Sequence, residues 1–303
     1  MAISAKDVQK LREMTGVGMM DCKKALTATD GDFDKAIEFL REKGLATATK
    51  KAGRIAAEGM AYAASIDGVG VVVEVNAETD FVAKNEKFVD FVKGVAATVV
   101  ANKPASLEAL LECTYAGSDM KVADKQTEMI QVIGENIKVR RFHFYADNTS
   151  VAYIHAGGKI GVLVNLKVEG GIDATEIGKD VAMQIAALNP RFWDKSQVSQ
   201  EVLDEEKKIM LAQMDADPKM ANKPAQVKEK IVVGKLNKFY VENCLLQQEF
   251  VKDGDFSVEK YIASAAKTLG GTVTFVDAVR FEKGEGIEKK ADDFAAEVAS
   301  MVK

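Results

Sequence analysis

The sequence predicts an α+β protein in which helical parts flank and interrupt two small antiparallel sheets. Three observations support this fold class. The first fifty or so residues contain short helical patterns separated by glycines. The middle of the chain twice shows a β-hairpin, a helix and a later strand. Residues 200–243 contain two charged helical patterns joined by a turn with two prolines.

The chain begins with two predicted helices. Ser4 and Asp7 are three residues apart and approximate a capping box at the start of the first helix, which ends at Gly16. The second helix is expected over about residues 19–27. Residues at helical spacing are expected to face inward: Val8, Leu11 and Met14 from the first helix, and Cys22, Ala25 and Leu26 from the second.

A third helix is predicted to begin after Asp32 and to stop at Gly44. Its inward residues are expected to be Phe33, Ile37 and Leu40. Residues 45–58 are predicted to form a helical linker. Three basic residues of this linker are expected on an ordinary solvated face: Lys50, Lys51 and Arg54.

The first half of the core is predicted from the clearest hairpin of the chain. The apolar strands 60–66 and 69–76 flank Asp67-Gly68, a dipeptide typical of a two-residue hairpin turn. A helix is expected over about residues 85–101, and residues 138–146 form the third strand candidate.

The second half of the core repeats this order. Residues 151–155 and 160–168 are the hairpin strands, residues 173–188 form the helix, and residues 272–282 form the later strand. Each half therefore predicts a small subdomain in which helices cover one face of an antiparallel sheet.

An inserted helical hairpin and a terminal helix complete the expected fold. Residues 200–216 and 224–243 are predicted helices joined by a short turn, which makes them a protruding antiparallel pair. A last helix over about residues 291–303 either docks on its own domain or is offered to a partner. Its apolar face contains Phe294, Val298 and Met301.

At 303 residues the chain is long enough for more than one domain. The expected parts are an N-terminal helical module (1–54), a core N-subdomain (55–148), a core C-subdomain (149–199 and 244–284), the inserted hairpin (200–243) and a C-terminal helical module (285–303).

Composition narrows the class of protein. Apolar residues make up 47% of the chain and charged residues 29%, which is ordinary for a soluble globular protein. A net charge of −5 argues against nucleic-acid binding, which depends on neutralising phosphates. The chain lacks an 18-residue apolar run and a signal-peptide core, so we expect a cytoplasmic protein that binds no membrane.

The sequence contains no recognisable catalytic or cofactor-binding arrangement. Its two histidines, His143 and His155, lack an accompanying nucleophile elbow, and no glycine-rich phosphate-binding motif follows a strand. Three distant cysteines predict neither disulfides nor a metal site: Cys22, Cys113 and Cys244. We therefore expect no enzyme activity, no cofactor and no metal.

The heptad at residues 79–85, Thr-Asp-Phe-Val-Ala-Lys-Asn, directly follows the second strand. Such a turn presents side chains to other molecules. Thr79 is expected to cap the next helix, with its hydroxyl accepting a helix amide. Phe81 lies seven residues before Phe88, and this spacing alone favours a buried position on the same helix face. The alternative is that Phe81 contacts a partner.

This heptad resembles the signature of the elongation factor Ts family, the nucleotide-exchange factors of elongation factor Tu. Four more segments are similar to family segments and follow in family order: 11–24, 31–44, 134–142 and 280–290. The resemblance extends from about residue 5 to the C-terminus. It implies that the N-terminal helices form a ubiquitin-associated-like module beside the core, the hairpin and the C-terminal helix.

The resemblance also implies a function and a site. The protein would bind elongation factor Tu, both GDP-bound and nucleotide-free, and promote GDP release by disturbing the magnesium and phosphate site during translation elongation. The site residues would be Thr79, Asp80, Phe81 and Val82, with Phe81 as a wedge and Asp80 as a polar anchor. Other implied partner contacts are Val17, Met19, Met20, His155, Phe294 and Val298. The inserted hairpin could mediate either a dimer of the complex or another contact, and the sequence does not decide between these two roles.

Two other interpretations remain from the residues alone. One is a hydrolase or transferase with a site around Asp80, Lys84 and His155, which the lack of catalytic groups disfavours. The other is a passive adaptor that uses residues 4–44, which the heptad disfavours. Residues 107–126 match no family segment and are interpreted as a loop variation.

Overall fold

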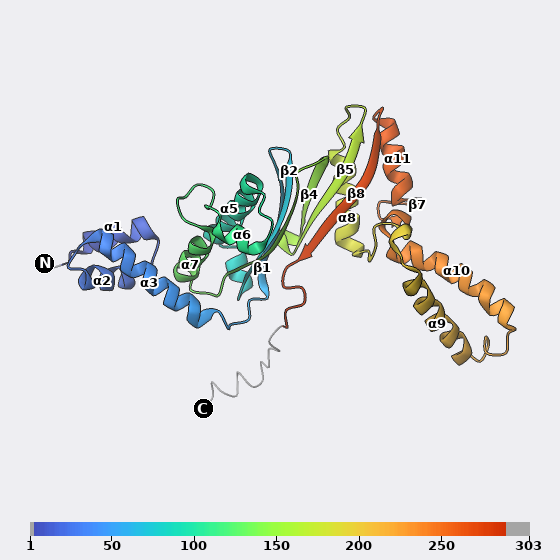
Figure 1. Cartoon of the computed structure of the whole chain (residues 1–303), viewed down its shortest axis with the longest axis horizontal. Helices are drawn as coiled ribbons and strands as arrows, with labels where there is room; N and C mark the ends of the chain where they lie inside the picture. The colour runs from blue at the N-terminus through green and yellow to red at the C-terminus, as the bar shows by residue number, and fades with distance from the viewer. Residues whose placement is uncertain (1–2, 289–303) are drawn as a thin grey trace.

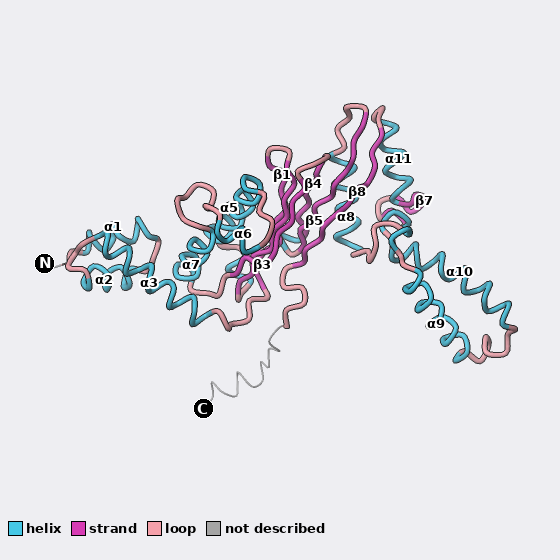
Figure 2. The backbone as a smooth tube through the Cα atoms, viewed as in Figure 1, coloured by secondary structure: helices cyan, strands magenta, loops and turns pink. Residues whose placement is uncertain are grey.

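The computed structural model describes residues 3–288 and places two antiparallel sheets back to back at its centre (Figure 1). The N-terminal helices extend to one side of the sheets, and a helical hairpin extends to the other. Figure 2 shows the same division, with the strands gathered in the middle and most helices outside them. The predicted α+β class is therefore confirmed.

The N-terminal module is a small three-helix unit. The Ser4 hydroxyl accepts the Asp7 amide at 3.1 Å, and the Asp7 carboxylate accepts the Ser4 amide at 3.2 Å, so the predicted capping box is present. Gly16 ends the first helix with a φ of 67°. Met14 is exposed rather than inward. The helices are α1 (Ala5–Thr15), α2 (Met19–Ala28) and α3 (Phe33–Lys51).

The sequence predicted that the third helix stops at Gly44. In the structure this helix continues to Lys51. Gly44 is buried where α3 packs against α7 (Val122–Ile133). A Cβ atom at this position would lie 2.8 Å from the side-chain oxygen of Gln131. The glycine therefore permits a close approach of two helices instead of ending one of them.

The basic residues at the end of this helix and just after it make contacts with the first subdomain. Lys51 donates a hydrogen bond to the carbonyl oxygen of Gly134. The Arg54 guanidinium lies 3.5 Å from the Glu78 carboxylate. These contacts connect the linker to the first subdomain. Lys50 and Arg54 are exposed, as expected, whereas Lys51 is half-buried.

The first sheet has the order β1-β2-β3, and its outer face is covered by helices. Asp67 and Gly68 have φ values of 50° and 79°, as a two-residue hairpin turn requires. The strands are β1 (Glu58–Ile66), β2 (Val69–Ala77) and β3 (Lys138–Tyr145). The covering helices are α5 (Glu86–Asn102), α6 (Leu107–Glu112) and α7.

The segment 107–126 is not a loop variation. It contains α6 and the first residues of α7, and it contributes Leu110, Tyr115 and Val122 to the buried core of the first subdomain. The Tyr115 ring stacks on Phe91, with ring centroids 5.8 Å apart. Burial raises the pKa of Tyr115 to about 12.

The second sheet has the order β4-β5-β8 and is also covered by helices on its outer face. Its strands are β4 (Thr149–His155), β5 (Ile160–Glu169) and β8 (Thr272–Glu282), and its helices are α8 (Thr175–Leu188) and α11 (Val258–Thr268). α11 was not predicted from the sequence, and neither was the small hairpin before it, β6 (Glu249–Phe250) and β7 (Asp253–Ser257). The predicted inserted hairpin is present as α9 (Gln200–Ala216) and α10 (Ala225–Asn243).

Small residues bring the two sheets together. A Cβ atom on Gly70 of β2 would lie 2.3 Å from the Ser150 Cβ of β4, and one on Gly161 of β5 would lie 3.0 Å from the Ala61 carbonyl oxygen of β1. β2 is consequently buried on both faces. The centre of the protein thus has four layers, helix, sheet, sheet and helix.

A buried carboxylate joins the segment after β8 to the first sheet. Glu74 of β2 is fully buried and accepts hydrogen bonds from the Gly284 amide at 2.8 Å and from Arg140 and Arg141 at 2.9 and 2.5 Å. Burial alone would raise the pKa of Glu74, but these bonds and one from Asn76 outweigh it and hold the pKa below its ordinary value. The charged form of Glu74 therefore stabilises this junction.

The predicted terminal helix with Phe294, Val298 and Met301 lies outside the described residues. Within residues 3–288, no helix combines the length and the apolar character needed to cross a membrane.

Candidate functional site

The heptad forms a single helical turn, α4 (Asp80–Ala83), directly after β2. Thr79 precedes it in extended conformation and occupies the capping position, but its hydroxyl accepts no helix amide. The hydroxyl instead donates a hydrogen bond to the Glu135 carboxylate at 2.7 Å. The predicted capping role of the Thr79 side chain is therefore wrong, because a nearby carboxylate is a stronger partner than a helix amide.

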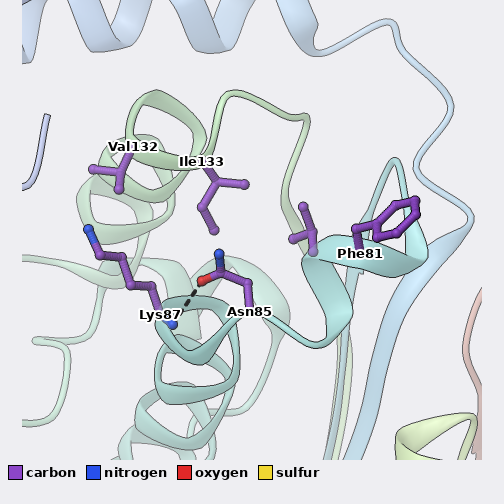
Figure 3. A pocket seen from close by; sticks show the side chains of 6 residues that line it. Phe81, Asn85, Lys87, Val132 and Ile133 are labelled. Atoms are coloured by element: carbon purple, nitrogen blue, oxygen red, sulfur yellow. Dashed lines mark hydrogen bonds between the residues drawn. The ribbon is translucent and has the colours of Figure 1, made fainter. Parts of the chain in front are cut away.

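Phe81 is the most exposed large apolar side chain of the described residues, at 80%. The interpretation as a core residue, based on its spacing from Phe88, is wrong. The helix is interrupted at Asn85, whose side chain accepts the Lys87 amide at 3.0 Å and caps α5 as a separate helix. Figure 3 shows the Phe81 ring turned away from Lys87 and Val132.

The neighbours of Phe81 anchor the turn or lie at the surface. Val82 is only 7% exposed and packs in the core of the first subdomain, so its side chain holds the turn rather than extending toward a partner. Asp80 and Lys84 form an exposed ion pair at 3.6 Å, one helical turn apart. Such pairs contribute little to stability, and this one leaves both side chains accessible.

Two neighbouring pockets extend from the turn to the N-terminal module. One, of about 310 Å³, is lined by Phe81, Val82, Asn85, Lys87, Val132 and Ile133 (Figure 3). The other, of about 480 Å³, is lined by Gln9, Arg12, Glu13, Gly16, Met19 and Lys87. Lys87 lines both pockets, so the two pockets adjoin at this residue.

The remaining predicted site residues differ in where they lie. Met19 and Met20 are exposed. Val17 is 2% exposed and packs in the core of the N-terminal module, and its contact with a partner stays a prediction. His155 is exposed at the end of β4, 3.1 Å from the Tyr153 hydroxyl, and lines neither pocket. Phe294 and Val298 lie outside the described residues.

The structure does not assemble the alternative catalytic group. Asp80 and Lys84 form their surface ion pair on α4, whereas His155 belongs to the second sheet. Among residues 3–288, no group of three His, Cys, Asp or Glu residues could hold a metal ion. What the surface offers is a large aromatic side chain on a fixed turn, which is typical of a protein contact.

The sequence did not point to two residues around this site: Lys87, which lines both pockets, and Glu135, which is bonded to the start of the turn. Glu135 belongs to the segment 134–142, which the analysis singled out for its family resemblance but gave no role. The family resemblance of that segment was the one feature of the sequence that could have pointed to Glu135.

Comparisons with known proteins agree with this organisation. A sequence profile described as Elongation factor TS matches residues 78–285. Elongation factor Ts of Syntrophotalea carbinolica is 48% identical and covers all of both chains. Elongation factor Ts of Trichlorobacter lovleyi is 49% identical over 99% of this chain and 98% of its own. The protein of the same name from Clostridium kluyveri is 47% identical over 99% of both chains.

The sequence similarity to these relatives places the chain in the class of translation elongation factors. These similarities extend over the whole length of the chain. The chain belongs to the elongation factor Ts family.

Proposed function

We propose that this protein is the guanine-nucleotide exchange factor of elongation factor Tu. It binds the GDP-bound and nucleotide-free forms and promotes GDP release during translation elongation, and it makes or breaks no covalent bond. Family membership supports the partner and the process. The observation that supports the mechanism is the 80% exposure of Phe81 on an otherwise anchored turn.

The turn has the properties of a wedge. Val82 is buried beneath it, and β2 leads directly into it, so the position of Phe81 is fixed by the core. Exposing a large aromatic side chain to water costs free energy. This cost is removed when a partner buries the side chain. In this proposal Phe81 enters the nucleotide-binding domain of elongation factor Tu and displaces groups that hold magnesium and phosphate, while Asp80 anchors the contact.

Exchange requires a difference in affinity between two states of the partner. A factor that binds the nucleotide-free form more tightly than the GDP-bound form shifts the equilibrium toward GDP release. The coupling is reciprocal, so GDP or GTP weakens the complex by the same factor. The second pocket, with Met19 at its edge and Met20 nearby on the same helix, supplies a further contact in this proposal. Met side chains adapt to varied partner surfaces.

The test is stopped-flow release of fluorescent GDP from elongation factor Tu, in excess magnesium and in chelator. We expect catalytic amounts of this protein to accelerate release, and the acceleration to be smaller once the metal is removed. Asp80→Ala and Phe81→Ala should differ less from wild type in chelator. Equal acceleration and equal defects in both conditions would refute the magnesium mechanism, and a lack of acceleration would favour the passive adaptor.

The hairpin of α9 and α10 projects away from the turn (Figure 1). A dimer of the complex through this hairpin remains a proposal. Light scattering gives the mass of the complex with and without residues 200–243, and a dimer through the hairpin requires that the mass fall to that of a single complex in the shortened chain. Thermal melting of the shortened chain is the control for folding.

A further inference from the structure

We infer that Glu135 is a positioning residue that sets the direction of Phe81. This inference rests on the proposed exchange function, since it concerns how the partner-facing turn is held. Glu135 lies 56 positions from Thr79 in the sequence, yet its carboxylate receives three hydrogen bonds from the start of the turn.

The carboxylate of Glu135 fixes the backbone that enters α4. One oxygen accepts the amides of Glu78 and Thr79, both at 3.0 Å, and the other accepts the Thr79 hydroxyl at 2.7 Å. Among the described residues, no other carboxylate is bonded to these two amides. Phe81 follows two residues later.

The connection is reciprocal. The Glu78 carboxylate accepts the amide of Asn136 at 2.6 Å, and the Asn136 side chain donates to the Arg54 carbonyl oxygen at 2.8 Å. The turn, the segment before β3 and the linker after α3 are therefore joined at one place. Gly134, with a φ of 87°, ends α7 and brings Glu135 to this position.

The turn needs this support because it is short. A helix of four residues is unstable by itself, since fixing its first turn costs more than its hydrogen bonds return. Thr79 makes no side-chain cap with α4. With Phe81 exposed, burial of Val82 and the bonds to Glu135 are what determine the direction in which the aromatic ring projects.

The test compares Glu135→Ala with Glu135→Gln. The amide oxygen of Gln can accept both backbone amides, and its NH₂ group can donate to the Thr79 hydroxyl, so this variant retains the connection. Glu112→Ala is the matched control, because Glu112 forms an exposed ion pair with Lys121 at 2.6 Å away from the turn. Thermal melting of each variant gives the folded fraction.

The first readout is independent of function. In a chain with Phe81→Trp and Trp193→Phe, the single tryptophan reports on the turn through its fluorescence anisotropy decay. Glu135→Ala should increase local motion of this tryptophan, whereas Glu135→Gln and Glu112→Ala should not. Unchanged motion in Glu135→Ala would overturn the inference.

The second readout is GDP release. Glu135→Ala should reduce the acceleration about tenfold, as expected for losing bonds to a charged group. In a Phe81→Ala background the same change should have no further effect, because Glu135 acts through Phe81. An equal reduction in both backgrounds would mean a separate structural role and would contradict the inference.

One outcome separates this inference from the proposed function. If the wild type fails to accelerate GDP release but the tryptophan still gains motion, exchange is wrong and the positioning contact stands. If Glu135→Ala does not fold, Thr79→Val removes only the hydroxyl bond, and the same changes are expected with smaller size. Their absence in Thr79→Val would again overturn the inference.

Discussion

Replacing Phe81 by Ala should abolish most exchange activity and leave the fold intact. Truncating a fully buried Phe to Ala costs about 3–5 kcal/mol of unfolding free energy. Phe81 is 80% exposed, so only about a fifth of that loss, at most about 1 kcal/mol, is expected here. Phe88 is the matched control, because it is fully buried in the same subdomain and Phe88→Ala should show the full loss.

The exchange activity of Phe81→Ala should fall strongly, in contrast to its small loss of stability. Burying a Phe side chain in a partner contributes about 1.5–3 kcal/mol, which corresponds to about a 10- to 100-fold change in rate or affinity. Denaturant unfolding gives the stability, and fluorescent GDP release gives the activity per folded molecule. A large loss of stability in Phe81→Ala with unchanged activity per folded molecule would refute the wedge.

Three further outcomes are expected. The unfolding free energy of the wild type should fall as the pH drops below 4.5, the ordinary pKa of a glutamate, and through the lower pKa of Glu74 in the folded protein. Glu74→Gln should make this fall smaller, as measured by denaturant titrations at each pH. Gly70→Ala should destabilise the protein by about 1–3 kcal/mol through overpacking between the sheets, whereas Gly18→Ala, with open space around its Cβ, should not lower the melting temperature in this way. Deleting residues 291–303 should weaken binding to elongation factor Tu without lowering the melting temperature of the core, and equal affinity in a binding titration would show that this segment is not needed.

Elements determined by neighbouring residues could be predicted from the sequence. The Ser4–Asp7 capping box, the Asp67-Gly68 turn and the strands around it depend on backbone preferences within a few positions. The same is true of the inserted hairpin, since prolines bound the turn between its two charged helical patterns. These features were confirmed nearly to the residue.

Features that depend on distant residues could not be predicted in this way. Gly44 was expected to end a helix because its contact with Gln131 is not visible in local sequence. Phe81 was spaced like a core residue, and only the Asn85 cap places it on a separate helix. The packing of the two sheets was also not predicted, although residues 69–73 of β2 form an apolar run typical of a strand buried on both faces.

The close contact between the sheets makes the centre of the protein a stiff spacer. Gly70 and Gly161 leave no room for the sheets to slide, and close-packed interiors deform little. The separation of the two sheets is therefore set by these small residues. A partner that contacts both subdomains would meet two surfaces whose spacing is fixed by the packing at the centre of the protein.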